Sequence, residues 1–199
     1  MKTIKLCMVA VATLFTFGLA NAQFGVQAGY SMSKPTLEDA TAFNGFHIGP
    51  TYELGIQGPL SINLGLLYDF TTQKIKDLND ANWTNHSFDI PVRISAAFPL
   101  STGVSAFVFG GPNFNIGLAN KIHKDGVSVD LYGDAAQQIL EISGAKFSRF
   151  DLQLGLGAGI KFNNMGIKAS YDFGMLNRVK NSDPAFKVND LKVSLFYNF

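Results

Sequence analysis

The sequence predicts an all-β fold, an eight-stranded antiparallel up-and-down transmembrane β-barrel. Three observations carry this prediction: a long strand with one apolar and one polar face, a strict alternation of short and long connections between strands, and an N-terminal export signal. Together they predict a narrow barrel in the outer membrane, with lipid outside and a polar interior.

Residues 150–162, FDLQLGLGAGIKF, have the most regular pattern in the chain. Every even position is apolar and every odd position is polar or glycine, which is the period of a β-strand with two unlike faces. At roughly 3.3 Å per residue and a tilt of about 40°, the segment rises roughly 30 Å, enough for the apolar band and both aromatic borders. Gly155, Gly157 and Gly159 lie on the polar face, where a narrow lumen needs small residues.

Seven further strands follow from alternation and turn residues. We place the eight strands at residues 24–32, 46–56, 60–73, 86–98, 103–116, 149–162, 166–177 and 188–199. The connections at 57–59, 99–102 and 163–165 are tight turns, whereas about 13, 12, 32 and 10 residues separate the other neighbours. Outer-membrane barrels have short periplasmic turns and long extracellular loops, so both termini are expected in the periplasm.

The third, fourth, seventh and eighth strands follow the same two-faced rule, with apolar residues outward and polar residues inward. In the fifth strand the phase stays open, because Phe107 and Phe109 compete with Val104, Ala106 and Val108 for the lipid face. The outward aromatic residues are expected to form two girdles. The lower girdle contains Phe24, Phe98, Phe162 and Phe199, and the upper one contains Tyr30, Phe46, Phe70, Phe88, Phe150 and Phe173.

The inward faces carry charges of both signs. They are the acids Glu53, Asp69, Asp89, Asp151 and Asp172 and the bases Arg93, Lys161, Lys168 and Lys192. Unpaired charges in a narrow, poorly hydrated lumen are costly, so these groups should form one network of ion pairs and hydrogen bonds. Arg93 is the expected centre, because a planar guanidinium can bridge two carboxylates. Eight strands enclose just enough space for side chains, so the network should close the barrel to solutes.

The N-terminus has the features of a secretory signal peptide. Lys2 and Lys5 precede an almost wholly apolar run, and Ala20-Asn21-Ala22 is an A-x-A cleavage site. We therefore divide the chain into a signal peptide, 1–22, and a single barrel domain, 23–199. Loss of the two lysines changes the formal charge from +1 to about −1, which gives no basic excess for nucleic acid. The only cysteine is Cys7, so disulfides are not expected in the exported protein.

The main alternative fold is a secreted soluble β-barrel or sandwich, in which the apolar faces would turn inward. The crowded glycines on the polar face argue against it, since a solvated surface does not need small residues. The C-terminus argues against it too. The last residues, Leu195-Phe196-Tyr197-Asn198-Phe199, resemble the final strand of outer-membrane barrels, whose terminal Phe is part of the signal read by the barrel-assembly machinery.

Two further motifs resemble a specific family. Phe88-Asp89-Ile90-Pro91-Val92-Arg93-Ile94 resembles the fourth strand, and Phe109-Gly110-Gly111-Pro112 the fifth, of the outer-membrane β-barrel family common in Bacteroidota, the PorT-like or "porin family" proteins. The similarity extends over all eight strands. It implies an integral outer-membrane protein, in a family with one branch linked to protein secretion.

Several apparent ligand sites have simpler explanations. Gly155-Leu156-Gly157-Ala158-Gly159 could resemble a nucleotide-binding loop, but such a loop must open a helix, and here the strand period continues through it. The acidic stretch 77–82 lacks the glycine and the distal glutamate of a calcium loop. We therefore expect neither a cofactor nor a metal ion.

The enzymatic alternative is a lipid-A-modifying barrel with a His, Ser and acid set. His86 and Ser87 are adjacent, so they point to opposite faces of their strand. His47 and Glu53 share a face but lie about 20 Å apart along it. His123, Asp125 and Ser128 belong to a long loop, where polar residues are usually only solvated. We expect no catalytic residues and no enzymatic activity.

The longest loop, 117–148, is where we expect function, since loops of this length are usually functional or disordered. Within it, residues 134–142 have the apolar spacing of a short helix, with Asp134 as its N-cap. The prediction is a monomeric barrel with a structural or surface-interaction role, surrounded by outer-membrane lipid and lipopolysaccharide, and with an extracellular ligand of open identity. A small-solute porin and a secretion-associated barrel stay as alternatives.

Overall fold

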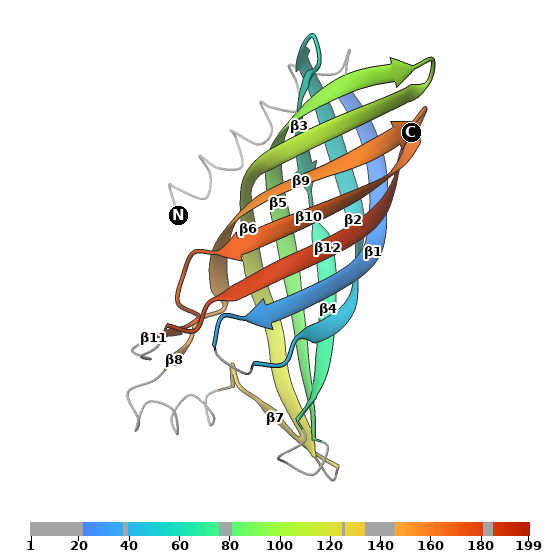
Figure 1. Cartoon of the computed structure of the whole chain (residues 1–199). Helices are drawn as coiled ribbons and strands as arrows, with labels where there is room; N and C mark the ends of the chain where they lie inside the picture. Colours follow the sequence, from blue (N-terminus) through green and yellow to red (C-terminus); the bar gives the residue numbers. More distant parts are fainter. Residues whose placement is uncertain (1–21, 38–39, 76–80, 125, 134–145, 181–184) are drawn as a thin grey trace, which may run out of the picture.

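The computed structural model is a single closed β-barrel (Figure 1). The structure describes residues 22–37, 40–75, 81–124, 126–133, 146–180 and 185–199. The strands that form the wall are β1 (Ala22–Pro35), β2 (Phe43–Gln57), β3 (Leu60–Gly65) with β4 (Leu67–Ile75), β5 (Ala81–Ser101), β6 (Val104–Lys124), β9 (Phe150–Phe162), β10 (Met165–Gly174) and β12 (Val188–Asn198).

The barrel is up-and-down and antiparallel throughout. Each wall strand pairs with the next along the chain, and β12 closes the ring by pairing with β1 from Gly25↔Asn198 to Pro35↔Val188. The predicted eight-stranded fold is confirmed, with β3 and β4 together forming the third strand. Their separation at Leu66 has a simple cause: the residue opposite is Pro50, which has no N–H to donate to the ladder.

One end of the barrel, here called the turn end, carries the three tight connections Gln57–Leu60, Ser101–Val104 and Phe162–Met165. Each of these turns contains a residue with a positive φ: Gly58 at 60°, Gly103 at 75° and Asn163 at 51°. Glycine and asparagine adopt this conformation with little steric cost. The opposite end, the loop end, carries the long connections, and Figure 1 shows the C-terminus at the turn end.

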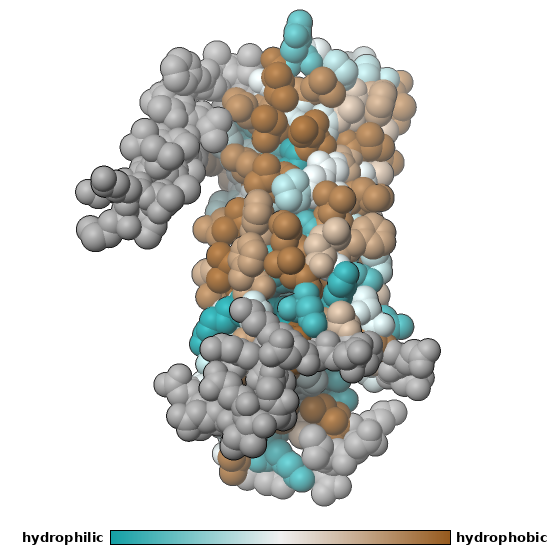
Figure 2. Space-filling view, turned by 90° about the vertical axis from the view of Figure 1, so that its left-hand side faces the viewer, coloured by the Kyte–Doolittle hydropathy of each residue, from teal (hydrophilic) through white to brown (hydrophobic). Residues whose placement is uncertain are grey.

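The wall has the two faces that the alternation predicts. Apolar side chains cover its outside, including Ile94, Leu156 and Leu195, which are 62%, 60% and 66% exposed. The buried residues are largely polar, as in Asp89 and Asp172, each 1% exposed. On the side that Figure 2 shows, brown, apolar atoms cover much of the described wall. This inverted arrangement suits lipid and contradicts the soluble β-barrel alternative.

Several strands run further than predicted at the loop end. The fourth strand was expected at 86–98 and the fifth to end at 116, but β5 begins at Ala81 and β6 continues to Lys124. The hairpin is longer because residues 82–86 of β5 pair with 119–123 of β6 beyond the point where β6 leaves β9. A short strand, β7 (Val127–Asp130), then folds back onto β6. The segment 117–148 is therefore partly sheet.

A second small sheet joins β8 (Lys146–Phe147) to β11 (Val179–Lys180) at the loop end. Three predictions fall mostly or wholly outside the described ranges. They are the signal peptide 1–22, of which 1–21 lie outside, the acidic stretch 77–82, of which 77–80 lie outside, and the helix over 134–142. Within the described ranges, no helix is long and apolar enough to cross a membrane.

Candidate functional site: the barrel lumen

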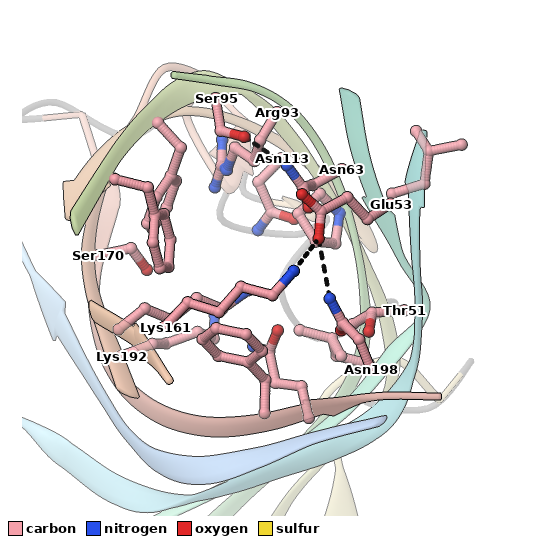
Figure 3. Close-up of a pocket in the computed structure, with 18 of the residues that line it drawn as sticks. Thr51, Glu53, Asn63, Arg93, Ser95, Asn113, Lys161, Ser170, Lys192 and Asn198 are labelled. Carbon is pink, nitrogen blue, oxygen red and sulfur yellow. Dashed lines mark hydrogen bonds and ion pairs between the residues drawn. The ribbon is translucent and has the colours of Figure 1, made fainter. Parts of the chain in front are cut away.

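Polar side chains from all the wall strands converge in the lumen, so the lumen is the candidate functional site. At its turn end, Lys161 of β9 reaches across to Glu53 of β2, with Nζ 3.2 Å from Oε2. Asn198 of β12 donates to the same carboxylate oxygen at 2.8 Å. Figure 3 shows this three-residue bridge across the barrel. Because both charged side chains remain about one quarter exposed, the bridge narrows the mouth without sealing it.

Behind this bridge lies a cavity of about 160 Å³. Phe107 and Phe109 of β6 and Phe196 of β12 form part of its wall, with Phe107 stacked on Phe109 and edge-on to Phe196. The phase of the fifth strand is therefore settled: both of its phenylalanines point inward, and Val108 between them is half exposed outside.

The inward glycines of β9 make room for these rings. A side chain at Gly157 would overlap the ring of Phe109, and one at Gly159 would press on Phe107. Gly166 of β10 does the same for Phe196. The run that resembles a nucleotide-binding loop is an uninterrupted strand, and its glycines at 157 and 159 make room for aromatic rings.

At mid-height, Arg93 of β5 forms a buried ion pair with Asp172 of β10, across the lumen. Its other terminal nitrogen donates to the carbonyl of Gly111. Gly111 has a φ of +148° on β6, opposite the Val92–Arg93 stretch of β5, and a side chain there would meet the Val92 carbonyl. The two motifs noted in the sequence therefore meet across one strand pair, and together they position the guanidinium.

The structure gives the central position of the ion-pair network to Lys192 of β12, not to Arg93. Its ammonium lies 2.6 Å from Asp89, 3.3 Å from Asp69 and 3.7 Å from Asp190. Among the described residues, Arg93 contacts a single carboxylate, that of Asp172. The reason is the position of each residue along the barrel. Asp69 of β4 and Asp89 of β5 point inward at the height of Lys192. Arg93 lies four residues further along β5, closer to the turn end, where it meets Asp172 of β10.

Next to Lys192 is a fully buried chain of hydrogen bonds around His47. Ser31 Oγ donates to Asp69 at 2.9 Å, so His47 Nδ1, also at 2.9 Å, must carry the proton that Ser31 accepts. His47 Nε2 then accepts from Ser194 Oγ at 2.9 Å. The order Ser, His, acid resembles a nucleophilic relay, but His47 and Ser31 are 0% exposed, and the adjacent cavity is not lined by Ser194.

The loop half of the lumen is filled by amides and carboxylates. Asn113 bridges Asp89 and Gln153 at 3.1 and 2.8 Å, and Gln153 donates to Asp190 at 2.7 Å. Above them, Arg178 donates to Asn115 and to the hydroxyl of Tyr132 at 3.4 and 3.3 Å. A small hollow of about 30 Å³ lies there among the described residues, enough for about one water molecule.

Two members of the predicted network are not joined to it. Asp151 is 0% exposed, yet among the described residues its carboxylate forms no ion pair and no hydrogen bond to another side chain. Lys168 contacts the rings of Phe109 and Phe196 rather than a carboxylate. Sequence reasoning missed Asp190, His47 and Arg178 as members. Asp190 could have been predicted from the sequence, because it lies two residues from Lys192 on the same strand and so points inward as well. Arg178 lies in a connection between strands, where no alternation of polar and apolar residues predicts the direction of a side chain.

The predicted girdle residues lie on the outer wall. Nine of them are between 36% and 72% exposed, and Phe70 is half-buried between the rings of Phe46 and His86. Strand pairing aligns Tyr30 with Phe46 and Phe46 with Phe70 at the loop-end level. At the turn-end level, Phe98 lies opposite Ala106, which also faces Ile160 near Phe162.

The sequence matches the family model for the outer membrane protein beta-barrel domain over residues 6–199. The chain belongs to this family. It is accordingly an outer-membrane β-barrel protein. Among curated proteins, no significant match to this sequence is found.

Two solved structures, Neisserial surface protein A and PagL, show the same fold at low sequence identity. Neisserial surface protein A is 15% identical with a TM-score of 0.52, and the match covers 90% of this chain and 99% of that one. The outer membrane enzyme PagL is 10% identical with a TM-score of 0.56, covering 87% and 98%. Ail, the attachment invasion locus protein of Yersinia pestis, is 17% identical with a TM-score of 0.47, covering 90% and 99%.

Proposed function

We propose that this protein is a closed, non-conducting barrel that anchors a surface-exposed loop assembly in the outer membrane. The observation that carries the proposal is the filled loop half of the lumen, from Lys192 with its three carboxylates to Arg178. A solute would have to break several buried, charge-assisted contacts at once, each costly to leave unpaired. This argument favours a structural or binding role over that of a general porin.

Purified protein in a planar lipid bilayer tests the closed lumen. We expect no steady ion-conducting steps at neutral pH. A sixteen-stranded porin in the same bilayer is the positive control, because barrels of that size contain an aqueous channel. Regular steps of porin size from this protein would overturn the proposal in favour of a small-solute porin.

The proposed orientation places the turn end and both termini in the periplasm and the loop end outside the cell, as the lengths of the connections favour. Residues 1–22 would direct export and be removed.

Insertion would use the barrel-assembly machinery, with Phe199 part of the signal that it reads. The inserted protein would be a monomer surrounded by lipid and lipopolysaccharide. The resemblance to PorT-like proteins of Bacteroidota favours that lineage, and a role in secretion stays the alternative.

The surface for an extracellular ligand would be the extension formed by the ends of β5 and β6 with β7. Val127 and Val129 on β7 are 65% and 48% exposed. Deletion of 118–147 is a direct test, because Gly117 N donates to the Arg149 carbonyl at 2.6 Å, so the chain leaves and rejoins the barrel at one point. Any surface binding by the protein should be lost with this segment. Binding that survives the deletion would place the site elsewhere.

We also propose that the protein is not an enzyme. The hydrogen-bonded serine, histidine and aspartate residues around His47 are buried in the lumen, where a lipid substrate has no access. Expression in a test host should leave the mass spectrum of lipid A unchanged. Loss or gain of an acyl chain, abolished by His47→Ala, would establish the lipid-A-modifying alternative.

A further inference from the structure

The cavity at the turn end contains a positive charge that the packing of the lumen leaves unbalanced. Lys168 of β10 has its ammonium 5.7 Å from the ring centre of Phe109 and 5.6 Å from that of Phe196. Within the described ranges it forms neither a hydrogen bond nor an ion pair. Aromatic faces attract a cation, but they do not neutralise it.

The other charges on the cavity wall cancel in pairs. Glu53 is paired with Lys161, Asp172 with Arg93, and Asp89 with Lys192. These six groups and Lys168 are the charged side chains among the described residues that line the cavity. One positive charge is therefore left, and it belongs to Lys168. The surplus acids, Asp69 and Asp190, lie outside the cavity around Lys192.

The lining of the cavity includes an apolar part. Phe109 and Phe196 contact Lys168, Phe107 contacts both of these rings, and Leu64 and Pro91 also line the cavity. A cavity of about 150 Å³ in an apolar protein interior holds benzene, and this one measures about 160 Å³. The space thus fits a body of about six carbon atoms beside a single charged group.

We propose that this cavity binds a small monocarboxylate with an apolar body, its carboxylate on the Lys168 ammonium and its body against the three phenylalanine rings. One uncompensated cation selects for one negative charge, since a second would face Glu53 or Asp172. The ligand would enter past the partly exposed Lys161–Glu53 bridge, from the periplasm if the proposed orientation holds.

The test is a titration of the folded, isotope-labelled protein in detergent micelles, followed by amide NMR shifts. Sodium benzoate is the probe, and benzyl alcohol is its neutral counterpart of similar size. We expect benzoate to shift the amides of Lys168, Phe109 and Phe196 and to bind about tenfold or more tightly than benzyl alcohol, since a hydrogen bond to a charged group is worth at least that factor. Equal affinities, or shifts confined to the outer wall, would overturn the proposal.

Two variants sharpen the test. Lys168→Met keeps the apolar stem and should weaken benzoate about tenfold or more, bringing it to the level of benzyl alcohol. Lys34→Met removes the same charge from an exposed lysine near the loop end and should leave benzoate binding unchanged. If Lys168→Met does not fold, Phe109→Leu provides the second measurement, because it should weaken both probes and leave their ratio intact. Unchanged benzoate binding in Lys168→Met would overturn the site.

This result is separable from the closed-lumen proposal. Conductance with intact benzoate binding would overturn the closed lumen alone, and a silent bilayer without benzoate binding would overturn the site alone.

Discussion

The guanidinium of Arg93 and the carboxylate of Asp172 meet across the lumen, over Gly155 of β9, where a side chain would overlap both groups. The pair joins β5 to β10, two strands that are not neighbours in the wall. It thus ties opposite sides of the barrel together in an environment where both side chains are almost completely buried.

Replacing Arg93 with alanine should therefore destabilise the barrel by about 3–5 kcal/mol, because Asp172 would stay buried without its partner. Urea unfolding in lipid vesicles measures this. Lys161→Ala is the matched control: its ion pair with Glu53 is partly exposed and should contribute at most about 1 kcal/mol. Equal losses in the two variants would contradict the buried pair.

Gly155→Ala should cost about 1–3 kcal/mol, since its methyl group would overlap Asp172 and Arg93 and force them apart. Gly110→Ala, on the neighbouring strand, is the control, because the nearest atom to its methyl group would be the Gly155 carbonyl oxygen at 3.4 Å. The same unfolding assay compares them. Equal losses of unfolding free energy in the two variants would mean that the ion pair is not what requires glycine at position 155.

Among the three lumen lysines, Lys192 should cause the largest loss of unfolding free energy when it is replaced by methionine. The replacement leaves Asp69, Asp89 and Asp190 without their shared cation, a loss of about 3–5 kcal/mol. A double-mutant cycle with Asp89→Asn measures the coupling directly. We expect the double variant to be more stable than the sum of the single losses predicts. Strict additivity would mean that the two groups do not interact in the folded barrel.

The contact of the outer wall with lipid can be tested by placing a charge at different depths in the bilayer. Leu156→Arg, at the middle of β9, should cost about 2–4 kcal/mol in bilayers, whereas Leu100→Arg, beside a tight turn, should cost about 0–1 kcal/mol. Both leucines are similarly exposed, at 60% and 64%, so exposure alone predicts equal effects. Equal losses would argue that the outer wall does not contact a hydrocarbon layer with a defined midplane.

Much of this molecule follows from local pattern. The alternation in residues 150–162 determines which side chains of β9 face lipid, because successive side chains of a strand point to opposite faces. The strict alternation of tight turns and long connections determines an up-and-down order. These two features, together with the apolar outer face, sufficed for the eight-stranded fold and for the inward position of most of the charges.

What the pattern could not determine is which inward groups meet. Phe107 and Val108 are both apolar, so the phase of β6 was decided by space: the rings fit inward only because Gly157 and Gly159 of β9 leave room for them. Lys192 became the centre of the charge network through the strand register, which brings acids from β4 and β5 to its height. Such meetings depend on the shear and closure of the whole barrel, which no single strand encodes. The surroundings of Lys168 also depend on the closed barrel. Alternation predicts that its side chain points inward, but only the tertiary structure places its ammonium beside two aromatic rings and not beside a carboxylate.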